Sequence, residues 1–256
     1  MSLTMQLLIL ILLPAAFLLP PAARAGEIIG GQEAQPHSRP YMAYLDIKNG
    51  EDEYECGGFL LSENVVLTAA HCNGDEITVH LGAHNIRKQE ESQQVIPARA
   101  KIPHPQYDEE IDNNDIMLLQ LDRKVKLNKW VKTIRLPHTH KTVKPGAKCS
   151  VAGWGQTGCA STADTLQEVD VEVLDDGACH KDPDGPYAHY NLSTMLCVGD
   201  PKKGKDSAQG DSGGPLVCKG KAQGIVSWGS CCPPGVYTRI STFIPWIREE
   251  MKKLHP

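Results

Sequence analysis

The amino-acid sequence predicts an all-β protein that ends in one α-helix. Short runs of apolar and β-branched residues recur along the chain and are broken by Gly, Pro, Asn and Asp, as in antiparallel sandwiches and barrels. Only the C-terminal segment places its apolar residues at a helical spacing. The chain has 256 residues, of which 41% are hydrophobic and 22% charged. This composition is ordinary for a globular protein and excludes a disordered or collagen-like chain.

The predicted strands are short runs bounded by turn-forming residues. In one of them Val171 and Val173 alternate with Asp170 and Glu172, which indicates a strand with one face in water. The predicted strands cover residues 41–47, 65–70, 77–81, 116–121, 166–173, 224–228 and 236–240.

The C-terminal helix is predicted from four apolar residues that share one face of a helix with 3.6 residues per turn. Ser241 or Thr242 is expected to cap its start, and Pro245 is tolerated in a first turn. The residues on the apolar face are Phe243, Ile247, Met251 and Leu254.

The N-terminus carries the signature of a secretory signal peptide. Residues 6–19 are almost entirely apolar, but a membrane-spanning helix needs about 20 such residues. Residues 23–25, Ala-Arg-Ala, match the small-x-small pattern of a signal peptidase site. We therefore expect residues 1–25 to be removed and the mature protein to have no membrane association. Nine cysteines also favour an oxidising compartment.

The overall charge excludes one class of partner. Lys and Arg number 26 and Asp and Glu 31, so the formal net charge is -5 at pH 7. A protein that wraps nucleic acid is expected to be strongly basic. We therefore predict no nucleic-acid partner.

Three segments bring together the residue types of nucleophilic catalysis. They contain His71 (Leu-Thr-Ala-Ala-His-Cys), Asp115 (Asn-Asp-Ile-Met-Leu-Leu) and Ser212 (Gly-Asp-Ser-Gly-Gly-Pro). A serine hydroxyl is a weak nucleophile, so it needs a base such as histidine, whose pKa lies near neutrality. The imidazolium that forms needs a buried carboxylate to orient and stabilise it.

In this order the three segments resemble the chymotrypsin-like serine proteases, and the resemblance extends from residue 28 to the C-terminus. Residues 152–155 (Ala-Gly-Trp-Gly) and 227–229 (Ser-Trp-Gly) also fit the family. The resemblance implies two six-stranded antiparallel Greek-key β-barrels with a C-terminal α-helix, and a protease domain over residues 28–256. It also implies an acyl-enzyme mechanism, with His71, Asp115 and Ser212 as catalytic residues. The backbone N–H groups of Gly210 and Ser212 would form the oxyanion hole.

The segment after the signal resembles a family activation junction. Residues 27–31 read Glu-Ile-Ile-Gly-Gly, so only the dipeptide 26–27 separates signal cleavage from Ile28. Such a dipeptide resembles the granzyme, mast cell chymase, cathepsin G and duodenase branch, in which a dipeptidyl peptidase removes it. The new α-ammonium of Ile28 would then pair with Asp211. For this branch we expect a monomer that is secreted or stored in cytoplasmic secretory granules, with serpin-type inhibitors as partners.

The resemblance also places a specificity pocket. Asp206 would form its base, while Ser227, Gly229 and Gly235 would line it. A buried carboxylate is costly without a counter-charge, so this base predicts cleavage after Arg or Lys. Residues 230–234 are expected to form a loop shorter than that of trypsin, which could change the pocket, so an aromatic preference is the alternative. A non-catalytic glycosaminoglycan-binding or antimicrobial family member is a second alternative, which the intact set of three residues disfavours.

Three disulfides are implied by the same resemblance: Cys56–Cys72, Cys149–Cys218 and Cys179–Cys197. Ala208 stands where trypsin-like members have one half of a fourth bridge. The remaining cysteines leave two alternatives open. Either Cys159 pairs with Cys231 or Cys232 and one thiol stays free, or the three remain free or form a bridge between the adjacent pair.

Weaker patterns complete the predictions. Asn191 begins an Asn-Leu-Ser glycosylation sequon. Residues 123–132 hold five basic residues, which could bind a sulfated glycosaminoglycan or form a solvated charged face. Ala83 stands where calcium-binding relatives have Glu, so we expect no calcium or other metal, and no cofactor.

Overall fold

The computed structural model describes residues 30–139, 142–157, 161–180, 185–200, 202, 204–229 and 234–254, without the side chains of residues 157, 161 and 162. The predicted signal segment, the dipeptide 26–27 and Ile28 lie outside the described residues, as do Cys159, Cys231 and Cys232. Among the described residues, no helix is long and apolar enough to cross a membrane.

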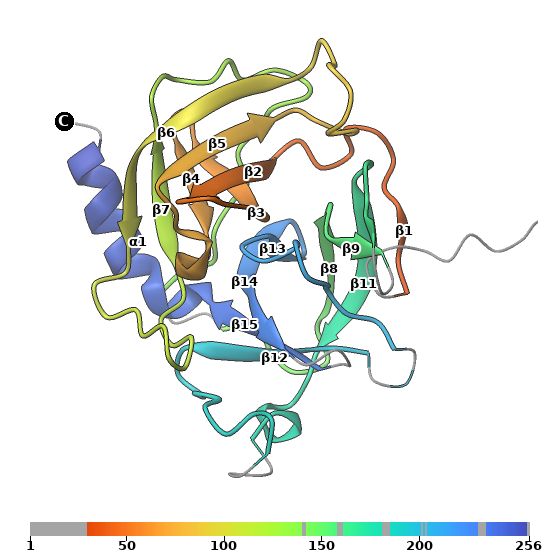
Figure 1. Ribbon diagram of the computed structural model, residues 1–256. Helices are drawn as coiled ribbons and strands as arrows, with labels where there is room; N and C mark the ends of the chain where they lie inside the picture. Colours follow the sequence, from red (N-terminus) through yellow and green to blue (C-terminus); the bar gives the residue numbers. More distant parts are fainter. Residues whose placement is uncertain are drawn as a thin grey trace, which may run out of the picture.

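The N-terminal half forms a closed six-stranded antiparallel barrel (Figure 1). Its strands follow one another around the barrel in the order β2-β3-β4-β7-β6-β5, and β5 closes on β2. The strands are β2 (Met42–Asn49), β3 (Asp52–Ser62), β4 (Val65–Thr68), β5 (Glu76–Leu81), β6 (Gln94–Pro103) and β7 (Met117–Leu121).

The C-terminal half forms the second barrel. Its strands run in the order β11-β12-β15-β14-β13-β8, and pairing of β8 with β11 closes the ring. They are β8 (Lys148–Gly153), β11 (Gln167–Val173), β12 (Met195–Gly199), β13 (Pro215–Cys218), β14 (Lys221–Gly229) and β15 (Gly235–Arg239). The short strand β1 (Gln32–Glu33) adds to β11, and β9 (Gln156–Thr157) pairs with β10 (Ser161–Thr162). The prediction of two six-stranded barrels is confirmed.

The interiors of the barrels follow from the alternation of the strands. On β11, Val169, Val171 and Val173 are buried inside the second barrel, whereas Asp170 between them is exposed. Because successive strand residues point to opposite faces, this apolar–polar pattern fixes which side of β11 turns inward. The prediction of a strand with one face in water over these residues is confirmed.

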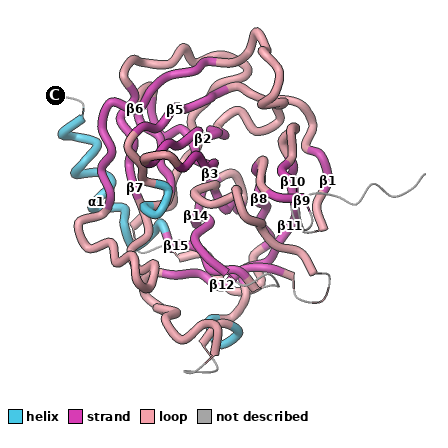
Figure 2. Tube along the Cα trace, viewed as in Figure 1, coloured by secondary structure: helices cyan, strands magenta, loops and turns pink. Residues whose placement is uncertain are grey.

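The C-terminal helix α1 (Ile240–Leu254) follows β15 of the second barrel and packs on the first barrel (Figures 1 and 2). Phe243, Ile244 and Ile247 belong to the same apolar cluster as the interior of the first barrel. The helix begins before both predicted caps, and Thr242 donates a hydrogen bond to the carbonyl of Ser193 (2.6 Å). Pro245 therefore lies deeper in the helix than we predicted.

Several strands do not show in the sequence pattern. The first half of β3 is acidic and exposed, and its centre contains Gly57 and Gly58. β6 contains Pro97 and ends at Pro103, and proline lowers the expectation of a strand. Both form because closure of the barrel gives each of them a partner on either side.

The structure contains the three predicted disulfides, Cys56–Cys72, Cys149–Cys218 and Cys179–Cys197. Their Cα–Cα distances of 6.2, 4.3 and 5.9 Å lie in or close to the range that a disulfide spans. A bridge of this kind typically adds about 2–4 kcal/mol to the free energy of unfolding.

Burial in the first barrel gives a stability prediction. Leu118 is fully buried, so Leu118→Ala should lower the free energy of unfolding by about 2–5 kcal/mol in a urea titration. Leu127 is 47% exposed, and Leu127→Ala should change this free energy by about 0.5 kcal/mol or less. Equal losses in the two variants would contradict the assignment of Leu118 to the core.

Candidate active site

The three residues predicted to be catalytic come from segments that the two barrels bring together. His71 lies on a short 3-10 helix, Ala70–Cys72, which follows β4 of the first barrel. Asp115 lies just before β7, also in the first barrel. Ser212 lies in the turn before β13 of the second barrel. The site is therefore assembled between the barrels.

His71 and Asp115 are joined by two hydrogen bonds. The imidazole Nδ1 of His71 lies 2.8 Å from Oδ2 of Asp115, and the backbone N–H of His71 donates to Oδ1 (3.0 Å). The carboxylate is fully buried, whereas the imidazole keeps 28% of its surface exposed. The ring is thus fixed from one side and accessible from the other, as a base that must exchange protons requires.

The second barrel also holds Asp115. Ser227 on β14 donates its hydroxyl to Oδ2 of Asp115 (2.5 Å). Thr238 on β15 donates its hydroxyl to the backbone carbonyl of Asp115 (2.6 Å). Ser227 was predicted only as a residue that lines the specificity pocket. Its bond to a residue far away in the chain has no signal in the sequence.

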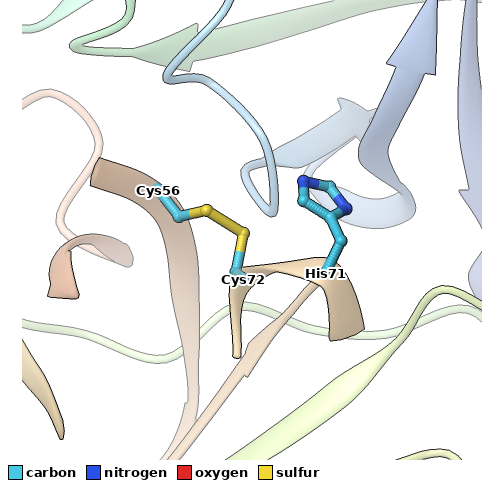
Figure 3. Close-up of side chains that lie close together, drawn as sticks. All are labelled: Cys56, His71 and Cys72. Carbon is cyan, nitrogen blue, oxygen red and sulfur yellow. A yellow bond between two sulfur atoms is a disulfide. The ribbon is translucent and has the colours of Figure 1, made fainter. Parts of the chain in front are cut away.

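The segment of Ser212 is attached to the first barrel through its backbone. Gly57 on β3 donates its N–H to the carbonyl of Ser212 (2.7 Å), and Sγ of Cys72 lies 3.7 Å from the same oxygen. Cys72 is bonded to Cys56 and follows His71 in the chain. Figure 3 shows His71 and Cys72 projecting from the same short helix. The disulfide therefore braces the segment that carries the imidazole next to the Ser212 backbone.

The turn around Ser212 requires glycine. Gly210 and Gly213 have positive φ angles of 92° and 81°. A Cβ at Gly213 would lie 2.1 Å from the Thr68 hydroxyl oxygen and 2.4 Å from the Gly57 carbonyl oxygen, so no side chain fits there. The N–H groups of Gly210 and Ser212 donate no hydrogen bond to any described residue. Two donors are thus available beside the serine hydroxyl.

Asp211 is a fully buried carboxylate that two glycines accommodate. A Cβ at Gly153 would lie 2.1 Å from Asp211 Oδ1, and a Cβ at Gly155 would lie 2.7 Å from the same oxygen. The N–H groups of Gly155 and Ala208 donate to this carboxylate (2.9 and 2.8 Å). Burial nevertheless raises the pKa of Asp211 to about 7. No described cation forms an ion pair with it.

Asp206 is also buried, with 3% of its surface exposed. Burial raises its pKa to about 6, although it accepts hydrogen bonds from the Ser207 N–H (2.8 Å) and the Tyr237 hydroxyl (3.2 Å). A Cβ at Gly235 would lie 2.8 Å from Asp206 Oδ1, and Gly229 is paired with Gly235 across β14 and β15. The structure thus brings the predicted pocket residues Asp206, Gly229 and Gly235 together.

A second carboxylate beside His71 was not among the predicted site residues. Atoms of His71, Asp112 and Asp115 lie within 4.8 Å of one another. Asp112 has a positive φ of 49° and accepts a hydrogen bond from the Tyr107 hydroxyl (3.2 Å). Burial raises the pKa of Asp112, and the nearby Asp115 raises it further. Residues 112–115 read Asp-Asn-Asn-Asp, a turn-forming run that does not indicate this proximity.

Electrostatics at the pair favour its ionised form. Burial alone would lower the pKa of His71, but Asp115 and then Asp112 raise it above its usual value. Burial alone would raise the pKa of Asp115, but the charge and hydrogen bonds of His71 and the Ser227 hydroxyl lower it. Asp115 is therefore ionised across the range in which His71 titrates.

Two groups of metal-ligand type lie at the site. One consists of Cys56, His71 and Cys72, and the other of His71, Asp112 and Asp115. In the first the two sulfur atoms form a disulfide, and in the second both oxygens of Asp115 already accept hydrogen bonds. In these two groups the sulfur atoms and the Asp115 oxygens therefore already have partners within the described chain.

Comparison with known proteins identifies the family. The sequence profile described as Trypsin matches residues 28–247. Human granzyme B is 55% identical over 247 residues, covering 95% of this chain and 98% of that protein. Human granzyme H is 52% identical over 245 residues, with the same coverage. A solved structure described as "Structure of GrC" superposes with a TM-score of 0.83 at 48% identity, covering 88% of this chain and all of the other.

The chain therefore belongs to the trypsin family of serine proteases, hydrolases that act on peptide bonds. Within that family it belongs to the granzyme and chymase branch. The resemblance found in the sequence is confirmed.

The charge of Asp112 gives a prediction for pH dependence. A base acts in its neutral form, so the acid limb of kcat/KM follows the pKa of His71. Asp112→Asn removes a negative charge that raises this pKa, so the acid limb should move to lower pH. Asp108, which also neighbours Asp112, offers the matched control Asp108→Asn, which should leave the limb in place. An unmoved limb in Asp112→Asn, or one moved to higher pH, would contradict the assignment.

Proposed function

We propose that this protein is a secreted or granule-stored serine endopeptidase, activated by removal of residues 26–27, that cleaves after Arg or Lys through an acyl-enzyme. The observation that carries the specificity is the buried carboxylate of Asp206 beside two facing glycines. The catalytic assignment rests on the His71–Asp115 pair and on the attachment of the Ser212 segment beside it.

In the proposed mechanism Ser212 attacks the carbonyl carbon of the substrate, and His71 takes the hydroxyl proton. Asp115 fixes the orientation of the ring and stabilises the imidazolium, as its low pKa and buried position allow. The N–H groups of Gly210 and Ser212 stabilise the oxyanion. His71 then gives its proton to the leaving amine. In the second half of the reaction His71 takes a proton from water, which attacks the acyl-enzyme and releases the acyl group from Ser212.

The specificity follows from the cost of an unpaired buried charge. An Arg or Lys side chain that reaches Asp206 supplies the counter-charge that no described residue provides. Glycine at positions 229 and 235 leaves room for such a long side chain. An aromatic substrate side chain would leave this carboxylate unpaired. A chymotrypsin-like preference for aromatic residues is therefore the alternative specificity.

Replacement of the proposed pocket base tests the specificity. Asp206→Ser should lower kcat/KM for an Arg peptide amide by at least about a hundredfold, because a charge-assisted contact is lost. In the unchanged protein, KM for the Arg substrate should rise as the pH falls through about 6, since protonated Asp206 no longer attracts a cation. The control substrate is the same peptide with Phe in place of Arg. Faster cleavage after Phe than after Arg in the unchanged protein would contradict the proposal.

Activation is proposed to work through Asp211. This carboxylate is fully buried, burial raises its pKa to about 7, and no described residue supplies a cationic partner. The α-ammonium of Ile28, freed when the dipeptide is removed, would supply that partner. Asp211 lies between Gly210 and Ser212, so pairing it would order the two proposed oxyanion donors.

Chains with defined N-termini test this activation. The form that starts at Ile28 should cleave peptides at least about a hundredfold faster than the form that starts at Gly26, since a buried pair that lacks one partner is destabilised by about 3–5 kcal/mol. A chain that starts at Ile29 is the control, because its free α-ammonium is one residue short of the expected position. Equal rates in the Gly26 and Ile28 forms would refute the proposal.

The stability of these forms should also differ with pH. Without a cationic partner, as proposed for the Gly26 form, the folded pKa of Asp211 is about 7 and lies above its usual value of 3.8. The folded state then binds more protons than the unfolded state, so the free energy of unfolding should fall as the pH rises from about 4 to about 7. The α-ammonium of Ile28 lowers this pKa, and the fall should be smaller in the Ile28 form. Urea titrations at pH 5 and 7 measure both slopes, and parallel slopes would contradict the pairing.

Location, processing and partners follow from the same proposal. Residues 1–25 would direct the chain to the secretory pathway, a dipeptidyl peptidase would expose Ile28, and residues 28–256 would form the mature monomer. Asn191 lies in a surface turn beside exposed Ser193, where a glycan has access. Protein substrates, serpin-type inhibitors and a glycosaminoglycan are the proposed partners. A non-catalytic binding role is the competing function, and labelling of Ser212 by a fluorophosphonate would exclude it.

A further inference from the structure

Two adjoining cavities lie at the C-terminal helix and the turn between β13 and β14. The first has a volume of about 410 Å³, and the second of about 510 Å³. They share Pro137, His138 and Lys221 in their walls, so they form one continuous groove. We call this feature the basic groove.

The walls of the basic groove carry cations and no Asp or Glu. Lys148 forms an ion pair with Glu172, which lies outside the walls. The other five cations have no ion-pair partner among the described residues: Arg135, Lys144, Lys219, Lys221 and Arg248. The protein as a whole has a net charge of -5, so the groove is a local region of positive charge on a protein that is negative overall. An anionic ligand would relieve their mutual repulsion.

The first cavity also has an apolar wall. The partly buried side chains of Leu136 and Met251 present its apolar surface, and they pack on the core cluster that contains Ile244 and Ile247 of α1. A ligand for this groove therefore has to offer both negative charges and apolar groups. A sulfated polysaccharide offers charges but no aliphatic side chains, whereas an acidic peptide with Leu or Ile offers both.

The groove lies at the opposite end of a hairpin from the candidate active site. β13 starts just after Ser212, and β14 ends at Ser227–Gly229. The turn that joins the two strands, with Lys219, lines the groove. None of the proposed catalytic and specificity residues lines the groove, so a ligand bound there leaves them accessible.

We propose that the basic groove binds an acidic, Leu- or Ile-containing segment of a protein substrate at a distance from the scissile bond. This inference concerns binding alone and does not depend on whether cleavage occurs after Arg or after an aromatic residue. The basic groove is a different site from the basic run at residues 123–132. In that run Lys124 pairs with Glu63 (3.1 Å), and Arg123 donates to the Val95 carbonyl (2.9 Å).

A fluorescence anisotropy titration of the mature full-length protein tests the proposal. The probe is a fluorescein-labelled twelve-residue peptide of Asp, Glu and two Leu, which contains no Arg, Lys, Phe or Tyr and so is no substrate under either specificity. The groove variant carries Arg135→Gln, Lys221→Gln and Arg248→Gln. The matched control removes the same number of positive charges from the basic run at residues 123–132, with Lys126→Gln, Lys129→Gln and Lys132→Gln. Cleavage of a small peptide amide and the thermal unfolding midpoint show that each variant is folded.

The groove variant should bind the peptide about tenfold or more weakly, because three exposed charge contacts are lost. The control variant should keep its affinity within about twofold, and neither should change cleavage of the small substrate. Exchange of the two Leu for Gly should weaken binding to the unchanged protein. Equal losses in the two variants, or equal affinity of the Leu and Gly peptides, would overturn the proposal. So would binding of a heparin oligosaccharide in this groove without binding of the peptide, which would assign the groove to a polysaccharide.

Discussion

The buried carboxylate of Asp115 is the constraint on which the site depends. It lies between the barrels and is held from both: His71 of the first barrel contacts both of its oxygens, while Ser227 and Thr238 of the second barrel donate to its side chain and its carbonyl. A charge in such a place is destabilising by several kcal/mol unless its partners stay in position. The same contacts that keep this charge tolerable therefore fix the imidazole and the relative placement of the two barrels.

Two further carboxylates of the second barrel are buried without a cation among the described residues. Burial raises the pKa of Asp206 to about 6 and that of Asp211 to about 7, although both accept backbone hydrogen bonds. The proposed function gives each one a cation from outside the described fold, a substrate side chain for the first and a new N-terminus for the second. In that view Asp115 has all its partners within the folded chain. Asp211 gains its cation only after processing, and Asp206 only when a substrate binds.

Sequence reasoning recovered the parts of the fold that carry a local pattern. The alternation on β11 predicted a strand with one face in water, and the apolar spacing near the C-terminus predicted α1, which begins one or two residues before the expected caps Ser241 and Thr242. It did not recover β3 or β6, because acidic residues, glycines and prolines obscure the strand pattern there. Asp112 was not predicted for a related reason: its importance lies in its short distance to His71, which the turn-forming run Asp-Asn-Asn-Asp at residues 112–115 does not reveal.

The sequence by itself determined the class of protein, because the segments around His71, Asp115 and Ser212 occur in one order with characteristic neighbours. It also predicted the partners in three disulfides through that resemblance, and left the other three cysteines open. Only the tertiary structure decided how Asp115 is held by the second barrel, which carboxylates are unpaired, and where the cations without acidic partners gather. The physical reason is that hydrogen bonds, burial and local potential depend on distances between segments that barrel closure brings together, and a linear pattern contains no such distances.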